Sequence, residues 1–359
     1  MQIADIDLAK YSNQYSSYTE LRLHENRLLN IALLNGDIVA NTQDTSGGVS
    51  ARVFDQGAWG FSSNPNATND SIEATIQAAT KNAEFLAKRS GDPEMQLPRS
   101  KASATSDSNT QKPRKSQDEI IAYLNDIDAY ITANCPDIVS RQVVLSCLDM
   151  EKKLTTSEGS AGHNTNSRAI VSVKLTTRNE AGDPIELSQA IGDRGQFEDV
   201  FETPERVHKA IDELYEHLLN KKTAVKPVSG YHEVILASDL AGILAHEAIG
   251  HTTEADIVRE GSIAGDHLGE KVASELITLV DFAHTYNGET LPMPIYLDDE
   301  GVESQDAVLI ENGVLKSFMH NKDSAAHYNM ALTGNARAFS YTDEPLIRMR
   351  NTAICRQRR

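Results

Sequence analysis

The sequence predicts an α+β protein in which N-terminal sheet-plus-helix domains precede a mainly β C-terminal domain. Two observations support this fold class. Clusters of strand-like segments are separated by single amphipathic helices, without the regular strand-helix alternation that builds a parallel sheet. The chain also has 359 residues, of which 40% are hydrophobic. That length and composition suit two or three domains with buried cores.

The chain opens with a predicted meander of strands followed by a helix. Alternating apolar, aromatic and β-branched side chains mark three strands, residues 18–25, 28–43 and 50–63. Asp70 and Glu73 follow at a spacing of three residues, which is typical of the start of a helix. Apolar residues then recur at helical spacing as far as Leu86. We expect this helix to cover one face of the sheet.

Composition divides the chain into three predicted domains, residues 1–90, 117–225 and 226–359. The segment 91–116, between the first two, has almost no apolar content and is rich in Ser, Thr, Lys and Pro. Such a segment cannot bury enough surface to fold by itself, so we expect a surface linker.

The middle domain is predicted to combine strands with two helices. Ser116 and Glu119 form the capping pattern of the first helix. The second helix is expected to begin near Pro204, because proline suits the first helical position. Strand-like patterns lie between these helices, in residues 138–148, 169–177 and 185–192.

The third domain is expected to begin with a strand, residues 231–238. Ser238 or Asp239 is a candidate cap for a helix that continues into the sequence LAHEAIGHTTEAD, residues 244–256. Further strand-like segments follow, residues 276–283, 294–301 and 307–320. We therefore predict a mainly β domain that carries this helix.

Charge and composition exclude several classes of protein. With 34 basic and 52 acidic residues, the net charge of −18 repels phosphate backbones and anionic lipids, so we expect neither nucleic acid nor a membrane as partner. The N-terminus lacks the features of a secretory signal, and the chain lacks the roughly 20 apolar residues of a membrane span. We expect a cytoplasmic protein. Its three cysteines include no CxxC pair, which argues against a disulfide framework.

The candidate catalytic residues lie in the segment 244–256. His246 and Glu247 are adjacent, and His251 stands five residues after the first histidine. Positions four residues apart lie about 40° apart around a regular helix, whereas positions five apart lie about 140° apart. A metal ion shared by both histidines therefore requires a local distortion such as a π-bulge. Gly250 is the residue that would tolerate one.

Two interpretations of this motif remain open from spacing alone. In the first, His246 and His251 bind zinc or a similar divalent metal and Glu247 takes a proton from water as the general base. Zinc normally needs a third protein ligand, for which the candidates are Glu254, Asp256, His267, Glu270 and Cys355. In the second, the segment is a core helix whose two histidines point in different directions.

Several further segments closely resemble the TldD half of the TldD/PmbA family, once described as modulators of DNA gyrase. They are RVFDQGAWGFSS near the N-terminus, HEAIGHTTEAD itself, and then GSIAGDHLGEKVAS (261–274), LDDEG (297–301), LIENGVLKSFMHNKDSA (309–325), TGNAR (333–337) and PLIRMRNT (345–352). The resemblance spans essentially the whole chain and is densest after Gly230.

This resemblance implies a cytoplasmic metallopeptidase that cleaves unfolded or modified peptides. It implies His246 and His251 as metal ligands, Glu247 as the catalytic residue, and a dimer, either of two copies or with an inactive PmbA-like (TldE) chain. Family members usually continue well beyond the PLIRMRNT segment, and a cysteine there is their third metal ligand. We therefore expect a C-terminal domain that is incomplete, and the alternative function is that of an inactive binding or regulatory member.

Two charged clusters each allow two interpretations. Arg337, Arg348 and Arg350 could bind a peptide carboxylate or carbonyl near the site, or could form ordinary ion pairs. The acidic run 298–300 could bind a hard cation, or could be a solvated turn.

Overall fold

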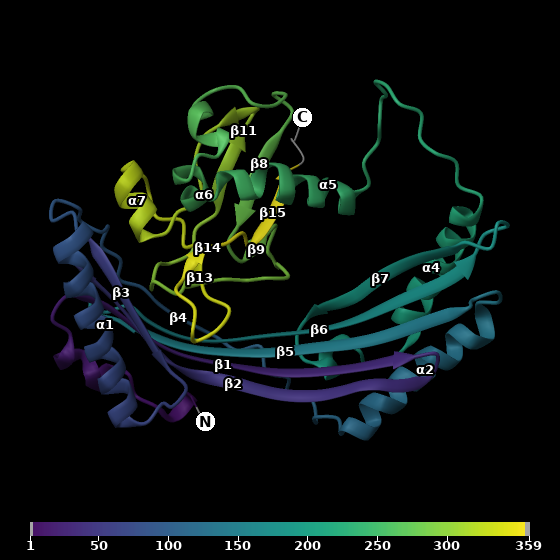
Figure 1. The fold of residues 1–359 in the computed structure, drawn as a ribbon, viewed down its shortest axis with the longest axis horizontal. Helices are drawn as coiled ribbons and strands as arrows, with labels where there is room; N and C mark the ends of the chain where they lie inside the picture. The colour runs from purple at the N-terminus through teal and green to yellow at the C-terminus, as the bar shows by residue number, and fades with distance from the viewer. Residues whose placement is uncertain (1–2, 356–359) are drawn as a thin grey trace.

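A long curved sheet carries the smaller C-terminal domain on its concave side (Figure 1). The structure is a computed structural model that describes residues 3–355. Within that range the large sheet has seven strands, ordered β3-β2-β1-β5-β6-β4, with β7 also paired to β6. Their bounds are β1 (Tyr18–Leu34), β2 (Asp37–Asp55), β3 (Ala58–Asn64), β4 (Ser103–Ser106), β5 (Ser140–Thr156), β6 (Ala161–Arg178) and β7 (Pro184–Arg194). The α+β prediction is confirmed.

One continuous sheet runs through the first two predicted domains. The meander β1-β2-β3 is antiparallel as expected, but β1 also pairs with β5 along most of its length, from Glu20 with Thr156 to Leu34 with Gln142. Pairing between strands so distant in sequence is not visible in local patterns. The proposed boundary at 91–116 stays a prediction, and the strands on its two sides share hydrogen bonds.

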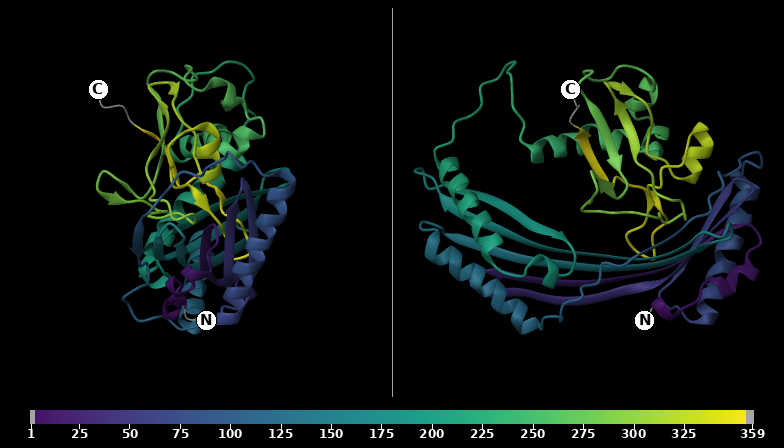
Figure 2. Two further views of the ribbon diagram at one scale, coloured as in Figure 1. Left: turned by 90° about the vertical axis from the view of Figure 1, so that its left-hand side faces the viewer. Right: turned by 180° about the vertical axis from the view of Figure 1, so that it is seen from behind.

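Helices cover the convex face of the sheet (Figure 2). Odd-numbered residues of β1 point to this face: Leu21 and Leu23 belong to the core that includes α1 (Asn69–Ser90), and Ile31 and Leu33 to the core that includes α2 (Gln117–Asn134) and α4 (Glu205–Lys222). The capping box of α2 is confirmed. The first helix instead takes Thr68 as its cap. Short helices η1 (Ile3–Asp5), η2 (Ala9–Gln14) and α3 (Phe197–Val200) complete this part.

The segment 91–116 is held to the sheet by polar contacts. Its strand β4 pairs in parallel with the start of β6. Beyond it, the backbone N–H of Ser108 donates to Thr165 Oγ1 at 2.6 Å, and that of Thr110 donates to Gln196 Oε1 at 3.0 Å. Hydrogen bonds to the sheet therefore position this segment, although its composition offers almost no apolar surface to bury.

The C-terminal domain has its own small sheet, ordered β12-β11-β8-β15. Its apolar core includes Leu279, Leu309, Phe318, Met319 and Met349. The strands of the domain are β8 (Thr278–Phe282), β9 (Thr285–Tyr286), β10 (Glu289–Thr290), β11 (Ala307–Glu311), β12 (Val314–Leu315), β13 (Ala336–Arg337), β14 (Leu346–Ile347) and β15 (Asn351–Cys355). Its helices are α5 (Ser238–Leu244), η3 (Ala245–Gly250), η4 (His251–Thr253), α6 (Ala255–Arg259), η5 (Ile263–His267) and α7 (Lys322–Tyr328).

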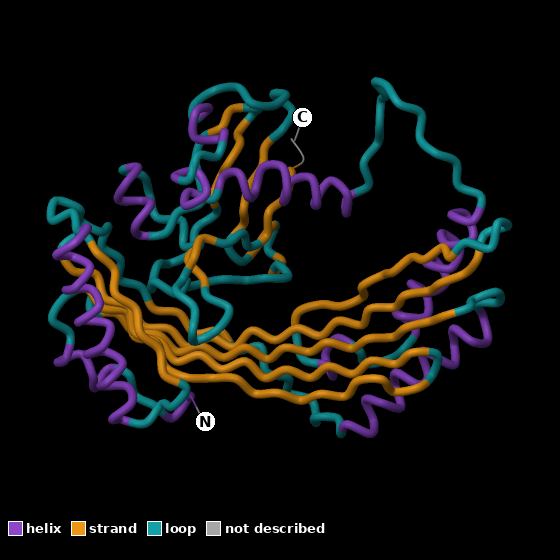
Figure 3. The backbone as a smooth tube through the Cα atoms, in the orientation of Figure 1, coloured by secondary structure: helices purple, strands orange, loops and turns teal. Residues whose placement is uncertain are grey.

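The strand expected at residues 231–238 is wrong. Figure 3 shows this part of the chain as loop, and Tyr231 and Ile235 are fully exposed. The alternating apolar pattern is present, but a strand also needs a partner, and no described strand pairs with this segment. Helix α5 does begin at Ser238, yet neither Ser238 nor Asp239 caps it, because the N-cap is Ala237. Most of the segment 294–301 is likewise irregular.

Buried polar residues join the concave face of the sheet to the C-terminal domain. Even-numbered positions of β1 point to this side, so that Asn26 Nδ2 donates to the Phe339 carbonyl at 2.7 Å. On β2, Arg52 forms an ion pair with Glu300 at 2.6 Å. On β5, Lys152 forms one with Asp299 at 2.6 Å. These contacts fix the C-terminal domain, and its candidate site, above the sheet.

The acidic run 298–300 fits neither interpretation offered by the sequence. All three side chains are buried, so the run is not a solvated turn. Asp298 accepts hydrogen bonds from the backbone N–H groups of Glu300 and Val302, while Asp299 and Glu300 bind basic side chains from the sheet. Its role is to join the two parts of the molecule. None of the described helices is long and apolar enough to cross a membrane.

Candidate metal centre

The helix that carries the motif changes its pitch within the motif. It is α-helical up to Leu244 and then π-helical from Ala245 to Gly250. The π-type hydrogen bond joins the two histidines themselves, because the backbone N–H of His251 donates to the carbonyl of His246. A π turn closes over five residues where an α turn closes over four. The distortion that the spacing required is therefore confirmed.

Gly250 allows this turn to lie close to the C-terminal core. A Cβ atom at this position would collide with the sulfur of Met349, a buried residue. The backbone φ of Gly250 is −54°, which any residue can adopt. Close packing, and not an unusual backbone conformation, is thus the reason that glycine suits this position.

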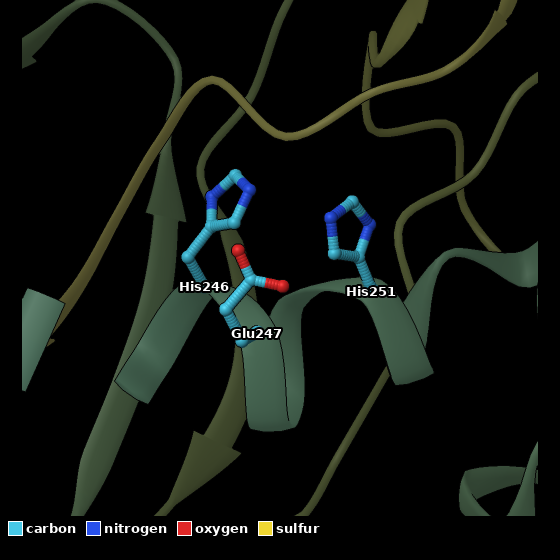
Figure 4. Close-up of side chains that lie close together, drawn as sticks. All are labelled: His246, Glu247 and His251. Atoms are coloured by element: carbon cyan, nitrogen blue, oxygen red, sulfur yellow. The ribbon is translucent and has the colours of Figure 1, made fainter. Parts of the chain in front are cut away.

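The π turn brings three potential ligand side chains together. The imidazole rings of His246 and His251 lie with centroids 4.8 Å apart at an interplanar angle of 82°. One ligand atom from each histidine and one from Glu247 all lie within 4.8 Å of one another. Figure 4 shows the Glu247 carboxylate between the two rings, with all three side chains on the same side of the helix. The alternative of divergent histidines is therefore wrong.

All three side chains are exposed, so a ligand can reach them from solvent. Among residues 3–355 this is the group of His, Cys, Asp and Glu side chains whose atoms converge closely enough to hold a metal ion. An exposed group of two imidazoles and one carboxylate offers the nitrogen and oxygen ligands that zinc and similar divalent metals prefer.

The candidate third ligands do not join this group. His267 and Glu270 bind each other at 2.7 Å. Cys355 lies on β15, where it pairs with Thr278 of β8. Asp256 lies in α6, and its pKa is raised mainly by burial. The fifth candidate, Glu254, is adjacent to the group and is described next.

Glu254 is not one of the three converging residues, but its carboxyl group contacts the imidazole of His251. Its carboxyl is buried, with Oε1 located 3.3 Å from His251 Nδ1. Burial, followed by the charge of Asp256, raises the pKa of Glu254 to about 7. Oε1 has no hydrogen-bond partner among the described residues, so its nearest polar neighbour is this imidazole nitrogen. A carboxylate on the rear nitrogen of an imidazole is the arrangement that orients metal-binding histidines.

This α+β architecture, with an HExxxH pair on a π turn, is typical of a class of metallopeptidase to which the chain is similar. Residues 229–358 match the profile of the PmbA/TldA metallopeptidase C-terminal domain, and residues 19–83 match PmbA/TldA metallopeptidase domain 1. A metalloprotease of Methanocaldococcus jannaschii is 30% identical over 348 residues, which cover 95% of this chain and 74% of the relative. The chain belongs to the TldD/PmbA metallopeptidase family.

Two further relatives agree with this assignment. A protein of Saccharolobus solfataricus named zinc metalloprotease TldD homolog is 28% identical over 339 residues, covering 94% of this chain and 72% of the relative. The crystal structure of TldE from Thermococcus kodakarensis superposes with a TM-score of 0.69 at 18% identity, covering 98% of this chain and 77% of that one. At that identity the likeness concerns the fold alone.

The sequence identified the three converging residues but not their support. It offered Glu254 only as a metal ligand, whereas the structure places its carboxyl 3.3 Å from Nδ1 of His251. The contact between Gly250 and Met349 was not foreseen either, because the two residues lie far apart in sequence. The adjacency of Glu254 to the motif was the available signal, since residues three apart on a helical turn lie on one face.

Proposed function

We propose that this chain is a metal-dependent peptidase with His246 and His251 as metal ligands and Glu247 as the general base. The observation that carries the proposal is the π turn, which aims three side chains at one point from a spacing that a regular helix could not use. Membership in a family of metallopeptidases supports the same activity.

The residues present fit a divalent cation of the zinc type. The two imidazoles and the carboxylate are exposed, and no ion pair with a basic residue occupies Glu247 among the described residues. The buried Oε1 of Glu254 lies 3.3 Å from His251 Nδ1, so the N–H at that nitrogen can point to the carboxylate and leave Nε2 free as a ligand. The name of the Saccharolobus relative supports zinc as the cation.

Glu247 can move the proton that peptide hydrolysis requires. When bound, a divalent cation supplies Lewis acidity, which lowers the pKa of water and polarises a peptide carbonyl. The carboxylate of Glu247 lies between the two imidazoles, where it can accept a proton from water and later give it to the leaving amine. Its position on the same turn as both histidines keeps it within reach of the reacting groups.

Unfolded or modified peptides are the proposed substrates. The site opens to solvent above the concave side of a large sheet, and extended peptides pair readily with strands and loops. The proposed assembly is a dimer, either of two copies or with a chain like TldE, whose fold this chain shares. The cytoplasmic location expected from the sequence stays a prediction.

A second function is that of an inactive binding or regulatory member of the family. It is favoured by one observation, that none of the candidate third protein ligands joins the group among residues 3–355. The two functions differ in metal content. A catalytic chain holds a stoichiometric metal ion, whereas an inactive member folds without one.

Metal analysis of the purified protein tests the proposal directly. We expect stoichiometric divalent metal in the wild-type protein and its loss in the double variant His246→Ala, His251→Ala, with an unchanged circular dichroism spectrum. The variant His267→Ala is a matched control, because His267 is an exposed histidine outside the group. A folded wild-type protein that binds no metal and hydrolyses no peptide would favour the inactive member.

A further inference from the structure

A cavity of about 280 Å³ lies between the large sheet and the C-terminal domain. One wall consists of side chains on the concave face of β5 and β6, among them Leu148, Lys152 and Arg168. The other wall belongs to the C-terminal domain and includes Arg337 and Arg348. The cavity thus lies in the interface that the buried polar residues hold in place.

The cavity is positively charged although the whole chain carries −18. Four basic side chains line it, Lys152, Arg168, Arg337 and Arg348, against the single acidic side chain of Asp299. That carboxylate is already engaged, because it binds Lys152 at 2.6 Å and Arg22 at 3.3 Å. The three arginines are therefore not neutralised by the wall itself.

Arg337 is the most buried of the three arginines and is incompletely hydrogen-bonded. Its Nε atom is buried without a hydrogen-bond partner among the described residues. One terminal nitrogen contacts Met293 Sδ at 2.8 Å, a weak acceptor, and the other donates to the carbonyl of Met349. No carboxylate in the described chain lies within ion-pair distance of the Arg337 guanidinium. The nearby Asp281 forms its ion pair with Arg350, at 2.8 Å. Burial lowers the pKa of Arg337 to about 10.

Of the other two arginines, Arg348 links the cavity to the metal centre. Arg168 is exposed on β6, and its side chain has no ion-pair or hydrogen-bond partner in the described chain. The guanidinium of Arg348 is 3.8 Å from Glu254 Oε2, and the other oxygen of Glu254 is 3.3 Å from His251. Arg348 therefore stands between the cavity and the back of a proposed metal ligand.

We propose that this cavity binds a carboxylate of the peptide substrate, a specificity that rests on the peptidase function proposed above. Guanidinium groups present planar, paired donors that match the two oxygens of a carboxylate, and the exposed guanidinium of Arg168 has no partner in the described chain. The apolar side chains of Leu148 and Phe339, which also line the cavity, can hold the neighbouring residue of the peptide. The carboxylate can be the C-terminus or an acidic side chain.

Equilibrium binding of peptides distinguishes these two sources. The protein is the full chain with Glu247→Gln, so that peptides are not consumed, and the probes are fluorescent hexapeptides measured by anisotropy. Three peptides suffice: a neutral one with a free C-terminus, the same one as its amide, and an amide in which one residue is Glu. Each is tested on variants Arg337→Met and Arg168→Met. The control is Arg178→Met, which removes an exposed arginine from the same strand and face as Arg168 but outside the cavity.

We expect the carboxylate to strengthen binding at least about tenfold, which corresponds to about 1.4 kcal/mol. If amidation weakens binding, the C-terminal carboxylate is the group that binds. If the Glu-containing amide binds more tightly than the neutral amide, an acidic side chain binds. Arg337→Met and Arg168→Met should each reduce the difference, whereas Arg178→Met should leave it. Because Arg168 is exposed, its variant tests the proposal even if Arg337→Met does not fold.

Equal binding of all three peptides, or no binding of any, would overturn the proposal. A carboxylate effect that persists in both cavity variants would overturn it as well. Hydrolysis by the protein with an intact Glu247 is measured separately. Carboxylate-dependent binding without hydrolysis would refute the peptidase function alone, while hydrolysis without carboxylate dependence would refute this inference alone.

Discussion

Two regions of the C-terminal domain differ sharply in how they are held. The charged base, defined by Asp281, Asp299 and Glu300 with their basic partners, is buried, and each of the three carboxylates forms an ion pair. The connecting segment, residues 223–244, leads to the metal motif and contributes no residue to the buried core of the protein. The difference teaches that the metal centre is positioned by the charged base and not by the connecting segment.

The charged base is held by buried ion pairs and hydrogen bonds. Arg350 and Asp281 are completely buried, and the guanidinium also donates to the carbonyls of Thr333 and Gln305. In the connecting segment, by contrast, helix α5 buries none of its residues, and large apolar side chains such as Tyr231 and Ile235 are fully exposed. Substitutions in the two regions should therefore have very different consequences.

Removing the central cation of the base should have the largest effect. Arg350→Met leaves the Asp281 carboxylate buried without its ion pair, which typically costs about 3–5 kcal/mol. We expect a loss of that size in the free energy of unfolding, measured by urea denaturation. The control Lys174→Met removes an exposed pair with Glu186 and should cost less than about 1 kcal/mol. Equal losses would show that burial of the base does not matter.

Filling the space at Gly250 should have the next largest effect. The Cβ of Gly250→Ala collides with Met349, and overpacking of this kind costs about 1–3 kcal/mol. We expect weaker metal binding as well, because the π turn must move away from the core. The double variant Gly250→Ala, Met349→Ala should restore metal affinity, measured by titration with a competing chelator. Failure of this rescue would mean that the contact does not define the turn.

Mild acid should weaken the interface between base and sheet. Burial, followed by the charges of Lys152 and Arg22, lowers the pKa of His24 from 6.5 to about 3. This histidine is thus neutral in the folded state, whereas the unfolded chain binds a proton below pH 6.5. Stability should fall as the pH drops from 6.5 towards 3, by about 1.4 kcal/mol per unit for this group.

Urea denaturation between pH 6.5 and 4.5 measures this dependence. The variant His24→Gln should lose that share of the slope. Burial also lowers the pKa of His320, to about 4, so some slope should remain in the variant. An unchanged slope in His24→Gln would contradict the assignment.

Substitutions in the connecting segment should have the smallest effect. Tyr231→Ser and Ile235→Ser remove fully exposed side chains, so we expect changes within about 0.5 kcal/mol in the free energy of unfolding. Urea denaturation at pH 7 measures both. A loss above 1.5 kcal/mol would show that the segment packs against the protein and would remove the contrast between the two regions.

The sequence predicted what depends on neighbouring residues. It predicted the capping box of α2, the meander β1-β2-β3 and the distortion at Gly250, because each follows from spacing within a few residues. It failed where distant residues decide. The alternating pattern of 231–238 lacks a described partner strand, and the acidic run 298–300 is buried by cations from β2 and β5.

The same limit applies to the candidate site. His246, Glu247 and His251 were predicted because they lie in one motif. The roles of Glu254 and of the arginines that line the cavity depend on contacts across the fold. The sequence left two interpretations open for the arginines, and the structure separates them: Arg350 belongs to a buried ion pair, whereas Arg337 has no acidic partner in the described chain.

The central claim, that Glu247 acts as general base beside a metal ion, is tested most directly by the single variant Glu247→Gln. We measure peptide hydrolysis and metal content on the same preparation, with Glu260→Gln, an exposed glutamate outside the group, as control. Loss of a general base typically reduces the rate by about 10²–10⁴-fold. We expect a loss of that size with metal stoichiometry retained. Hydrolysis at the wild-type rate in a metal-loaded Glu247→Gln protein would contradict the account.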